Sequence, residues 1–363
     1  MPKKITLTLT PEIAYNPSEL RRVALRTIGE NPDTNEGLKV RLLKRSIDSR
    51  QAIIKVNLEA EIGNVEELGS PIHYTKPTKP LPSHAKRILI VGTGPAGLFA
   101  ALRLVELGLK PILIERGKDV RARRFDLVKV NQKGGIDADS NYCFGEGGAG
   151  TFSDGKLYTR STKRGDFRRV LEIFHAHGAR EDVLIDTHPH IGTNLLPAII
   201  SKIRETLEAV GAEFHFSTRV VDFEFEGALS PSRIKGVLTQ YGDRIQAEAV
   251  ILATGHSARD IYRLLQRRGV RIEAKPFALG VRVEHAQQWL DSVQYRQPER
   301  GPHLPASSYR LVAQIKHEGV ERGVFSFCMC PGGFIVPAAT ALGEIVVNGM
   351  SPSRRDSPYA NSG

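Results

Sequence analysis

The stretch that decides the fold runs from residue 87 to residue 97 and reads RILIVGTGPAG. Its four apolar residues after Arg87 predict a short buried strand, and glycines follow that strand with the spacing GxGxxG. Apolar residues then recur at helical spacing over 98–105, and residues 111–114 predict a second buried strand that ends in Glu115. Strand, glycine turn, helix, strand and acid in this order are the dinucleotide-binding fingerprint of a Rossmann-type βαβ unit.

Each part of this fingerprint has a physical role. Gly92 permits the tight turn, Gly94 lets the backbone approach a pyrophosphate, and Gly97 allows the helix to pack closely on the strand. The free N–H groups of the helix N-terminus favour an anion at the same place. Glu115 is placed to accept hydrogen bonds from the ribose of an adenosine. The residues expected to contact a dinucleotide here are Gly92, Gly94, Pro95, Ala96, Gly97 and Glu115.

A second signature lies about 160 residues downstream. Residues 214–225, 234–239 and 244–247 predict the strands of a three-stranded β-meander. The meander leads into the apolar strand 249–252 and then into Ala253-Thr254-Gly255. In flavoproteins such a strand returns to the nucleotide-binding sheet, and its glycine passes close to the cofactor. The two signatures in this order specify FAD rather than NAD.

A further GxGxxG occurs at residues 145–150, but it fails its context test because residues 137–143 before it are polar and predict no strand. Two interpretations remain for these small residues. They form a flexible loop, or they let a bulky planar ring lie against the backbone. The fingerprint at 87–97 favours the second interpretation.

The remaining chain predicts an α/β protein with several parts. Alternation over residues 3–10 and 54–62, with a helix start at 16–19, indicates a small α+β module. Prolines at 71, 77, 80 and 82 indicate a linker. The expected domains are an N-terminal α+β module at 1–67, a Pro-rich linker at 68–85, a Rossmann-type FAD-binding domain with β-meander at 86–274, and an inserted substrate domain at 275–363.

Composition limits the class of protein. No window reaches the roughly 18 uninterrupted apolar residues of a membrane span, and the polar N-terminus does not resemble a signal peptide. Three cysteines exclude a disulfide scaffold and favour a reducing compartment, so we expect a cytoplasmic protein. The formal net charge of +11 suits anionic partners such as dinucleotides, and it motivates an alternative, an RNA-interacting flavoprotein.

Longer stretches carry a resemblance to a known family. They are RILIVGTGPAG at 87–97, FGEGGAGTFSDGKL at 144–157, PHIGT at 189–193, GVRVEH at 280–285, FCMCPGG at 327–333 and VNGMS at 347–351. The segment KRSIDSR at 44–50 also resembles the family's N-terminal module. With these motifs the chain resembles the FAD-dependent dehydrogenases, also called NAD(FAD)-utilising dehydrogenases.

The resemblance implies a set of FAD contacts. Gly92, Gly94, Gly97 and Glu115 would hold the ADP half, and Arg116 and Arg124 would assist at the phosphates or adenine. The backbone near Val220 would meet the adenine, and Thr254 with Gly255 would line the pyrophosphate side. The loop near the isoalloxazine would comprise Gly147, Gly148, Ala149, Gly150 and Thr151.

One departure from the family pattern concerns the end of the chain. Flavoproteins of this build close with a Gly-Asp motif that holds the ribityl-phosphate portion, and residues 255–363 contain no such segment. We therefore expect a chain that is C-terminally truncated relative to the pattern and lacks the closing segment of the FAD domain. This feature leaves open a second alternative, a non-catalytic flavoprotein remnant.

The expected activity is that of an FAD-dependent oxidoreductase that transfers a hydride through flavin N5 to or from an unidentified organic substrate. The candidate catalytic residues are His190 and Lys156, with His256 as a further candidate near the ring. There is no second fingerprint for NAD(P), so a nicotinamide donor would dock transiently or another reductant would serve.

The histidines and the cysteines are the other residues of the sequence that could carry chemistry. The histidines at 175, 177, 188 and 190 do not reproduce a standard zinc spacing, so no metal site is expected. Cys328 and Cys330 follow an apolar, strand-like run, which is typical of buried, inert cysteines, and a CxC pair would close a strained ring. Cys143 beside the glycine loop is the better candidate for proximity to a flavin.

Overall fold

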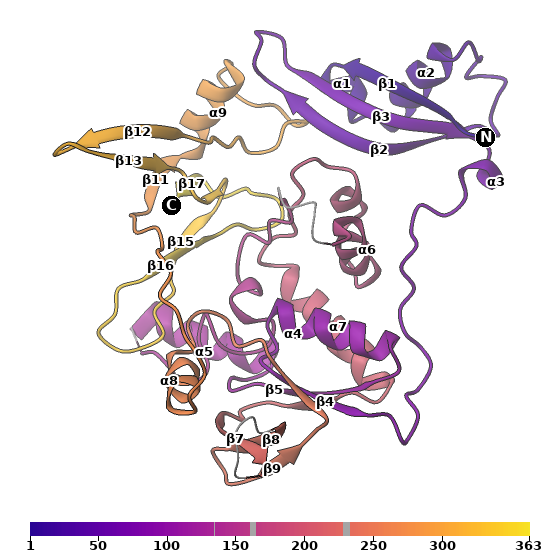
Figure 1. Ribbon diagram of the computed structural model, residues 1–363. Helices are drawn as coiled ribbons and strands as arrows, with labels where there is room; N and C mark the ends of the chain where they lie inside the picture. Colours follow the sequence, from indigo (N-terminus) through magenta and orange to yellow (C-terminus); the bar gives the residue numbers. More distant parts are fainter. Residues whose placement is uncertain (134, 160–164, 228–232) are drawn as a thin grey trace.

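The computed structural model describes residues 1–133, 135–159, 165–227 and 233–363 (Figure 1). A parallel sheet of four strands organises the middle of the chain: β4 (Arg87–Val91), β5 (Lys110–Ile114), β6 (Glu213–His215) and β10 (Ala249–Leu252). Their order is β10-β4-β5-β6, and each neighbouring pair is parallel. The expected parallel sheet, and the return of the 249–252 strand to it, are thereby confirmed.

Helices pack on this sheet and on one another, because each buries apolar side chains. They are α4 (Pro95–Glu106), α5 (Val120–Lys133), α6 (Phe167–Ala176) and α7 (Leu196–Ala209), with short 3₁₀ turns at Gly148–Gly150 and Glu181–Leu184. Figure 1 shows α4 and α7 next to each other over β4 and β5. Leu98 and Ile203 are fully buried in the core beneath them. This core fixes α4, and hence its N-terminus, at the end of β4.

A meander of three antiparallel strands lies beside the parallel sheet. It consists of β7 (Val220–Glu226), β8 (Arg233–Thr239) and β9 (Arg244–Gln246) in the order β7-β8-β9. The beginning of the expected stretch 214–225 belongs elsewhere, because β6 pairs in parallel with Ile112–Ile114 of β5. The helix α8 (Arg259–Arg267) follows β10 and contacts β7.

The N-terminal part forms its own antiparallel sheet in the order β1-β3-β2. Its elements are β1 (Lys3–Leu9), α1 (Pro11–Ala14), α2 (Pro17–Thr27), β2 (Lys39–Asp48), β3 (Lys55–Gly63) and α3 (Val65–Leu68). The Asn16 side chain caps α2 by accepting hydrogen bonds from the N–H groups of Ser18 and Glu19. The edge strand β2 was not expected, because its apolar residues are interrupted by charged ones.

The N-terminal part touches the rest of the chain at a few polar contacts and through a small apolar cluster of Ile47 and Ile54 with Tyr295 and Leu304. Arg45 Nε donates to Asp186 Oδ1 at 2.7 Å, and the Tyr15 ring stacks on His303. Figure 1 shows the chain between α3 and β4 as an extended segment along the side of the molecule.

The C-terminal region is built from short strands and one helix. These are β11 (Val283–Ala286), α9 (Gln287–Tyr295), β12 (Val312–His317), β13 (Val320–Phe325), β14 (Met329–Cys330), β15 (Phe334–Pro337), β16 (Val347–Met350) and β17 (Tyr359–Ser362). They form the sheets β11-β17-β14, β12-β13 and β15-β16. The helix α5 of the central part contacts β15. Among the described residues, no helix is long and apolar enough to cross a membrane.

The contact between α4 and β4 predicts that Gly97→Ala destabilises the fold. A Cβ at this position would overlap the carbonyl oxygen of Gly92. Because that oxygen belongs to the backbone turn, relief requires moving the helix, and we expect a loss of about 3 kcal/mol in the free energy of unfolding. Urea denaturation followed by circular dichroism measures the loss, and Gly37→Ala is the control because nothing lies within 4 Å of its added Cβ. Equal stabilities of the two variants would contradict the packing described.

Candidate functional site

A cavity of about 630 Å³ opens at the carboxyl ends of β4, β5 and β10. Ligands of open α/β sheets bind at this edge, and the volume lies in the range of small-molecule sites. The lining residues come from both glycine loops, from the turns after β5 and β10, and from α8. They include Gly92, Gly94, Pro95, Ala96, Glu115, Arg116, Cys143, Phe144, Gly148, Ala149, Gly150, Arg219, Val220, Thr254, Gly255, His256 and Asp260.

The first glycine loop brings its backbone to the cavity. Gly92 has φ +106°, and a Cβ there would overlap the carbonyl oxygen of Ala253, so the turn requires glycine. At Gly94, which caps α4, an added Cβ would have only the Gly148 Cα near it, at 3.8 Å. That open space, directly before the N-terminus of α4, fits a pyrophosphate approaching the backbone.

The second glycine loop packs on the first. Gly147 has φ +75°, and its N–H donates to the carbonyl of Thr93 at 2.9 Å. A Cβ on Gly148 would lie 3.0 Å from the Cα of Gly94. The second glycine loop, at residues 145–150, does not follow a strand as a nucleotide-binding motif would. It nevertheless forms one wall of the cavity that the first glycine loop borders.

Glu115 joins the two loops. One carboxylate oxygen accepts from the N–H and the hydroxyl of Thr93, at 2.9 and 2.8 Å. The other accepts from the N–H groups of Gly117 and Gly145, both at 3.0 Å. The side chain is buried, so these four bonds hold the turn after β5 against both loops. Glu115 was expected to accept hydrogen bonds from a ribose, but each of its carboxylate oxygens already accepts two hydrogen bonds from the chain itself.

Two arginines give the cavity a basic edge. Arg116 stacks its guanidinium over the Phe144 ring at 4.4 Å and pairs with Asp139 at 2.6 Å and Asp260 at 3.0 Å. Arg219 also pairs with Asp139, at 3.3 Å. The acids fix the arginines in place and leave a polar rim along the side where β7 begins. Sequence reasoning found Arg116 and the backbone near Val220, but not the side chain of Arg219, which directly precedes Val220.

A buried arginine holds the second loop from below. Arg123 is fully buried and donates to the carbonyls of Asn141, Glu146 and Tyr142 at 2.8, 2.8 and 2.9 Å. Burial lowers the pKa of Arg123 to about 10, so it stays charged at neutral pH. The sequence singled out its neighbour Arg124, which is exposed and does not line the cavity.

The Glu146 side chain completes the support of this loop. It is fully buried and accepts from Arg204 Nε at 2.7 Å and from the Val120 N–H at 2.8 Å. Burial raises the pKa of Glu146 against the opposing effects of these partners. The ion pair between Glu146 and Arg204 joins the second glycine loop to α7, which packs against α4.

Most of the expected cofactor residues line the cavity, and four do not: Gly97, Arg124, Gly147 and Thr151. Gly97 lies in the first turn of α4, on the side of the helix that packs on Gly92. The buried Thr151 hydroxyl donates to the Glu146 carbonyl at 2.9 Å. His256 and Cys143 do line the cavity.

The two residues expected to be catalytic lie together at a second place. Lys156 and His190 form an isolated antiparallel bridge. Lys156 Nζ pairs with the buried Asp154 at 2.9 Å, and Arg355 pairs with the same carboxylate oxygen at 2.9 Å. His190 Nε2 lies 3.1 Å from the Ser353 carbonyl. None of these residues lines the cavity at the glycine loops.

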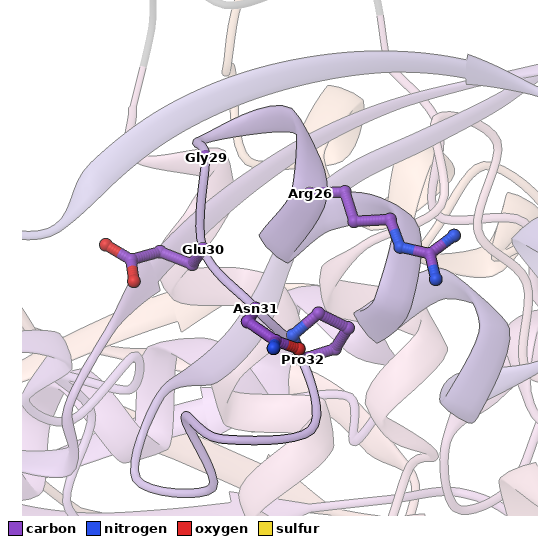
Figure 2. Close-up of a pocket in the computed structure, with 5 residues that line it drawn as sticks. All are labelled: Arg26, Gly29, Glu30, Asn31 and Pro32. Carbon is purple, nitrogen blue, oxygen red and sulfur yellow. The ribbon is translucent and has the colours of Figure 1, made fainter.

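Other candidate groups have local partners. His177 Nδ1 lies 2.7 Å from the Ile173 carbonyl, and His175 Nδ1 lies 3.0 Å from that of Ala179. Within the ranges that the structure describes, no three His, Cys, Asp or Glu side chains are arranged to hold a metal ion. Figure 2 shows a separate hollow of about 370 Å³ lined by Arg26, Gly29, Glu30, Asn31 and Pro32, which contains none of the expected site residues.

Comparison with family models supports a flavin-related class. Residues 276–363 match the model described as "FAD-dependent protein, C-terminal domain-like". Residues 1–63 match a domain of unknown function, DUF8436.

Relatives extend this result. An uncharacterized protein of Clostridium beijerinckii is 40% identical over 336 residues, which cover 88% of this chain and 61% of that protein. The chain therefore spans less than two thirds of that relative's length. A D-amino acid dehydrogenase of Helicobacter pylori is 38% identical over 73 residues, 20% of this chain and 16% of that enzyme. With the family match, these similarities confirm the resemblance of this chain to FAD-dependent proteins.

Solved structures are more distant. The THI4 protein of Thermovibrio ammonificans is 18% identical with a TM-score of 0.35, covering 52% of this chain and 64% of that one. Glycine oxidase from Geobacillus kaustophilus is 15% identical with a TM-score of 0.31, covering 51% and 59%.

The buried guanidinium predicts that Arg123→Met costs about 3–5 kcal/mol in the free energy of unfolding, because three carbonyls lose their donors together. Urea denaturation is the measurement. Arg124→Met, one residue along the same helix but exposed, should change stability by less than about 0.5 kcal/mol. Comparable losses in both variants would refute the role assigned to Arg123.

His190 predicts a pH-dependent stability. Burial, followed by the charge of Arg355, lowers the pKa of His190 from 6.5 to about 4 in the folded chain. Between these values the unfolded chain binds the extra proton, so stability is lost as the pH falls from 6.5 towards 4. The loss should approach about 3 kcal/mol, since one pKa unit corresponds to about 1.4 kcal/mol. His190→Gln keeps a donor for Ser353, and in urea titrations it should lose less stability over this window than the parent chain; identical pH profiles would disprove the assignment.

Proposed function

We propose that this chain is the FAD-binding part of an oxidoreductase, and that the cavity between the two glycine loops holds the ADP half of FAD. The observation that carries the proposal is the open space at Gly94, between the N-terminus of α4 and Gly148. The match of residues 276–363 to FAD-dependent proteins supports the same cofactor.

The lining residues suit the parts of such a ligand. Backbone at Gly94 and the N-terminus of α4 would take the pyrophosphate. The backbone of Val220, with Arg219 and Arg116 beside it, would border the adenine, and Thr254 and Gly255 would border the phosphates from the other side. Glu115 would reach a ribose only by sharing oxygens that already accept four hydrogen bonds.

The bound flavin would supply hydride transfer at its N5 atom, to or from an organic substrate that is not identified. The chain's own residues would bind and orient it. Gly148, Ala149 and Gly150 present a flat, small-residue wall on which a planar ring could lie, and Glu146 and Arg123 keep this wall rigid from behind. A nicotinamide donor would have to reach the ring from solvent.

Gly94→Val tests the cofactor site. In the unliganded chain an added Cβ at position 94 makes only an ordinary van der Waals contact, 3.8 Å from the Gly148 Cα, and φ is −65°, so the chain should still fold. The same side chain would fill the pyrophosphate position, and we expect the Kd for FAD to rise about 100-fold, which is about 2.7 kcal/mol. Flavin fluorescence titration measures Kd, and thermal unfolding checks the fold. The matched control is Gly37→Val, for which nothing lies within 4 Å.

The visible absorption spectrum of the purified chain comes before that titration. A flavin spectrum of the protein, as purified or after FAD has been added and the unbound FAD removed by gel filtration, supports the proposal. A folded chain that retains no flavin after this treatment, or a Gly94→Val variant that binds FAD as the parent does, would refute it.

A further inference from the structure

Two cysteines of the C-terminal sheet lie beside Lys156, outside the cofactor cavity. Lys156 Nζ is 3.6 Å from the Sγ of Cys328 and 3.6 Å from the Sγ of Cys330. Cys330 is fully buried, whereas Cys328 is partly exposed, as is Lys156, whose side chain is 36% exposed. A reagent from solvent can therefore reach Cys328 before Cys330.

The two thiols share one face of an extended segment. Residues two apart in an extended segment point the same way, and their Cα atoms are about 6.6 Å apart, near the upper limit that a disulfide spans, which agrees with the strained ring that the CxC spacing predicts. The Cys328 N–H and carbonyl pair with the backbone of Gly363, which keeps the segment extended alongside β17.

The surrounding groups shift the pKa values of the two thiols in opposite directions. The pairing with the Cys330 thiol lowers the pKa of Cys328, and the charges of Lys156 and Arg282 act in the same direction against burial. The same pairing, together with burial, raises the pKa of Cys330. Despite burial, Asp154 and the two cysteines raise the pKa of Lys156, which keeps it cationic.

Polar groups without partners gather around the pair. Arg282 donates to Asn361 Oδ1 at 2.6 Å, and a Cβ on Gly349 would lie 2.8 Å from the Cys330 sulfur and close to both of these side chains. Several buried atoms here have no hydrogen-bond partner among the described residues: Asn361 Nδ2, Arg282 Nε, Ser351 Oγ, Asp154 Oδ1 and Arg355 Nε. Buried polar atoms are normally satisfied, so this set indicates room for a polar ligand or water.

We propose that Cys328 and Cys330 form a thiol–disulfide exchange centre, with Cys328 as the attacking thiolate, Cys330 as the resolving thiol, and an anionic low-molecular-weight disulfide as the substrate. A partly exposed thiolate next to a lysine, with a buried protonated thiol two residues away, is the arrangement that such exchange requires. The substrate's charge follows from three cations at this place, Lys156, Arg282 and Arg355, of which Lys156 and Arg355 share the carboxylate of Asp154.

The exchange balances in two steps. The Cys328 thiolate attacks one sulfur of the substrate, forms a mixed disulfide and releases the other half as a thiolate. The Cys330 thiol gives its proton to that thiolate or to solvent, attacks the Cys328 sulfur and releases the second half. The dithiol is oxidised to a disulfide by two electrons and the substrate is reduced to two thiols. An excess of the same thiol reverses the reaction.

Alkylation of the parent chain tests the thiolate. The reduced chain is treated with limiting iodoacetamide at pH 6 without added FAD, and the modified peptides are quantified by mass spectrometry. Cys328 should react about tenfold faster than Cys143, and the difference should disappear in urea. Lys156→Met should raise the pH midpoint of Cys328 alkylation by about one unit, whereas Lys156→Arg should restore it. Equal rates at Cys328 and Cys143 in the folded chain would overturn the proposal.

Oxidised glutathione tests the exchange. The parent chain should lose two mass units through a Cys328–Cys330 disulfide, Cys330→Ser should trap glutathione on Cys328, and Cys328→Ser should form neither product at this site. The cationic disulfide cystamine should react about tenfold more slowly than glutathione disulfide. A parent chain that forms no internal disulfide, or that reacts faster with cystamine, would contradict the assignment. Both tests proceed without flavin, so their outcome is separate from that of FAD binding.

Discussion

The approach of α4 to β4 is the constraint on which the rest of the structure depends. Gly92 turns the chain against the carbonyl of Ala253, and Gly97 lies against the carbonyl of Gly92. A side chain at Gly97 would push the helix off the sheet, and one at Gly92 would push away the turn that follows β10. Because both residues are glycine, α4 can begin at the edge of the sheet where β4, β5 and β10 end. The cavity opens at this edge.

Buried charges then give this edge its shape. Glu115 accepts hydrogen bonds from N–H groups of both glycine loops. Arg123 donates to the backbone carbonyls of residues 141, 142 and 146. The Glu146 carboxylate pairs with Arg204 of α7. Each charge would be costly in the core without its partners, so the loop positions are strongly determined. A loop made almost entirely of small residues can be a rigid wall for this reason.

The C-terminal region contributes a second chemical centre rather than a wall of the first. It carries Cys328, Cys330, Arg282 and Arg355, while Asp154, Lys156 and His190 reach it from the central part of the chain. Lys156, which the sequence offered as a catalytic partner of a flavin, thus lies beside a pair of thiols. The ion pair of Asp154 with Arg355 joins the two parts.

The sequence by itself determined the parts whose cause is local. The apolar runs at 87–91 and 249–252, the GxGxxG spacing and the alternation over 3–10 predict the parallel sheet, its glycine turn and an N-terminal strand, because each depends on neighbouring residues. Only the tertiary structure decided which of two adjacent arginines is buried, that Glu115 serves the loops, and that Lys156 meets Cys328 and Cys330. Those contacts join residues far apart along the chain, and no local pattern encodes which long-range partner a side chain will find.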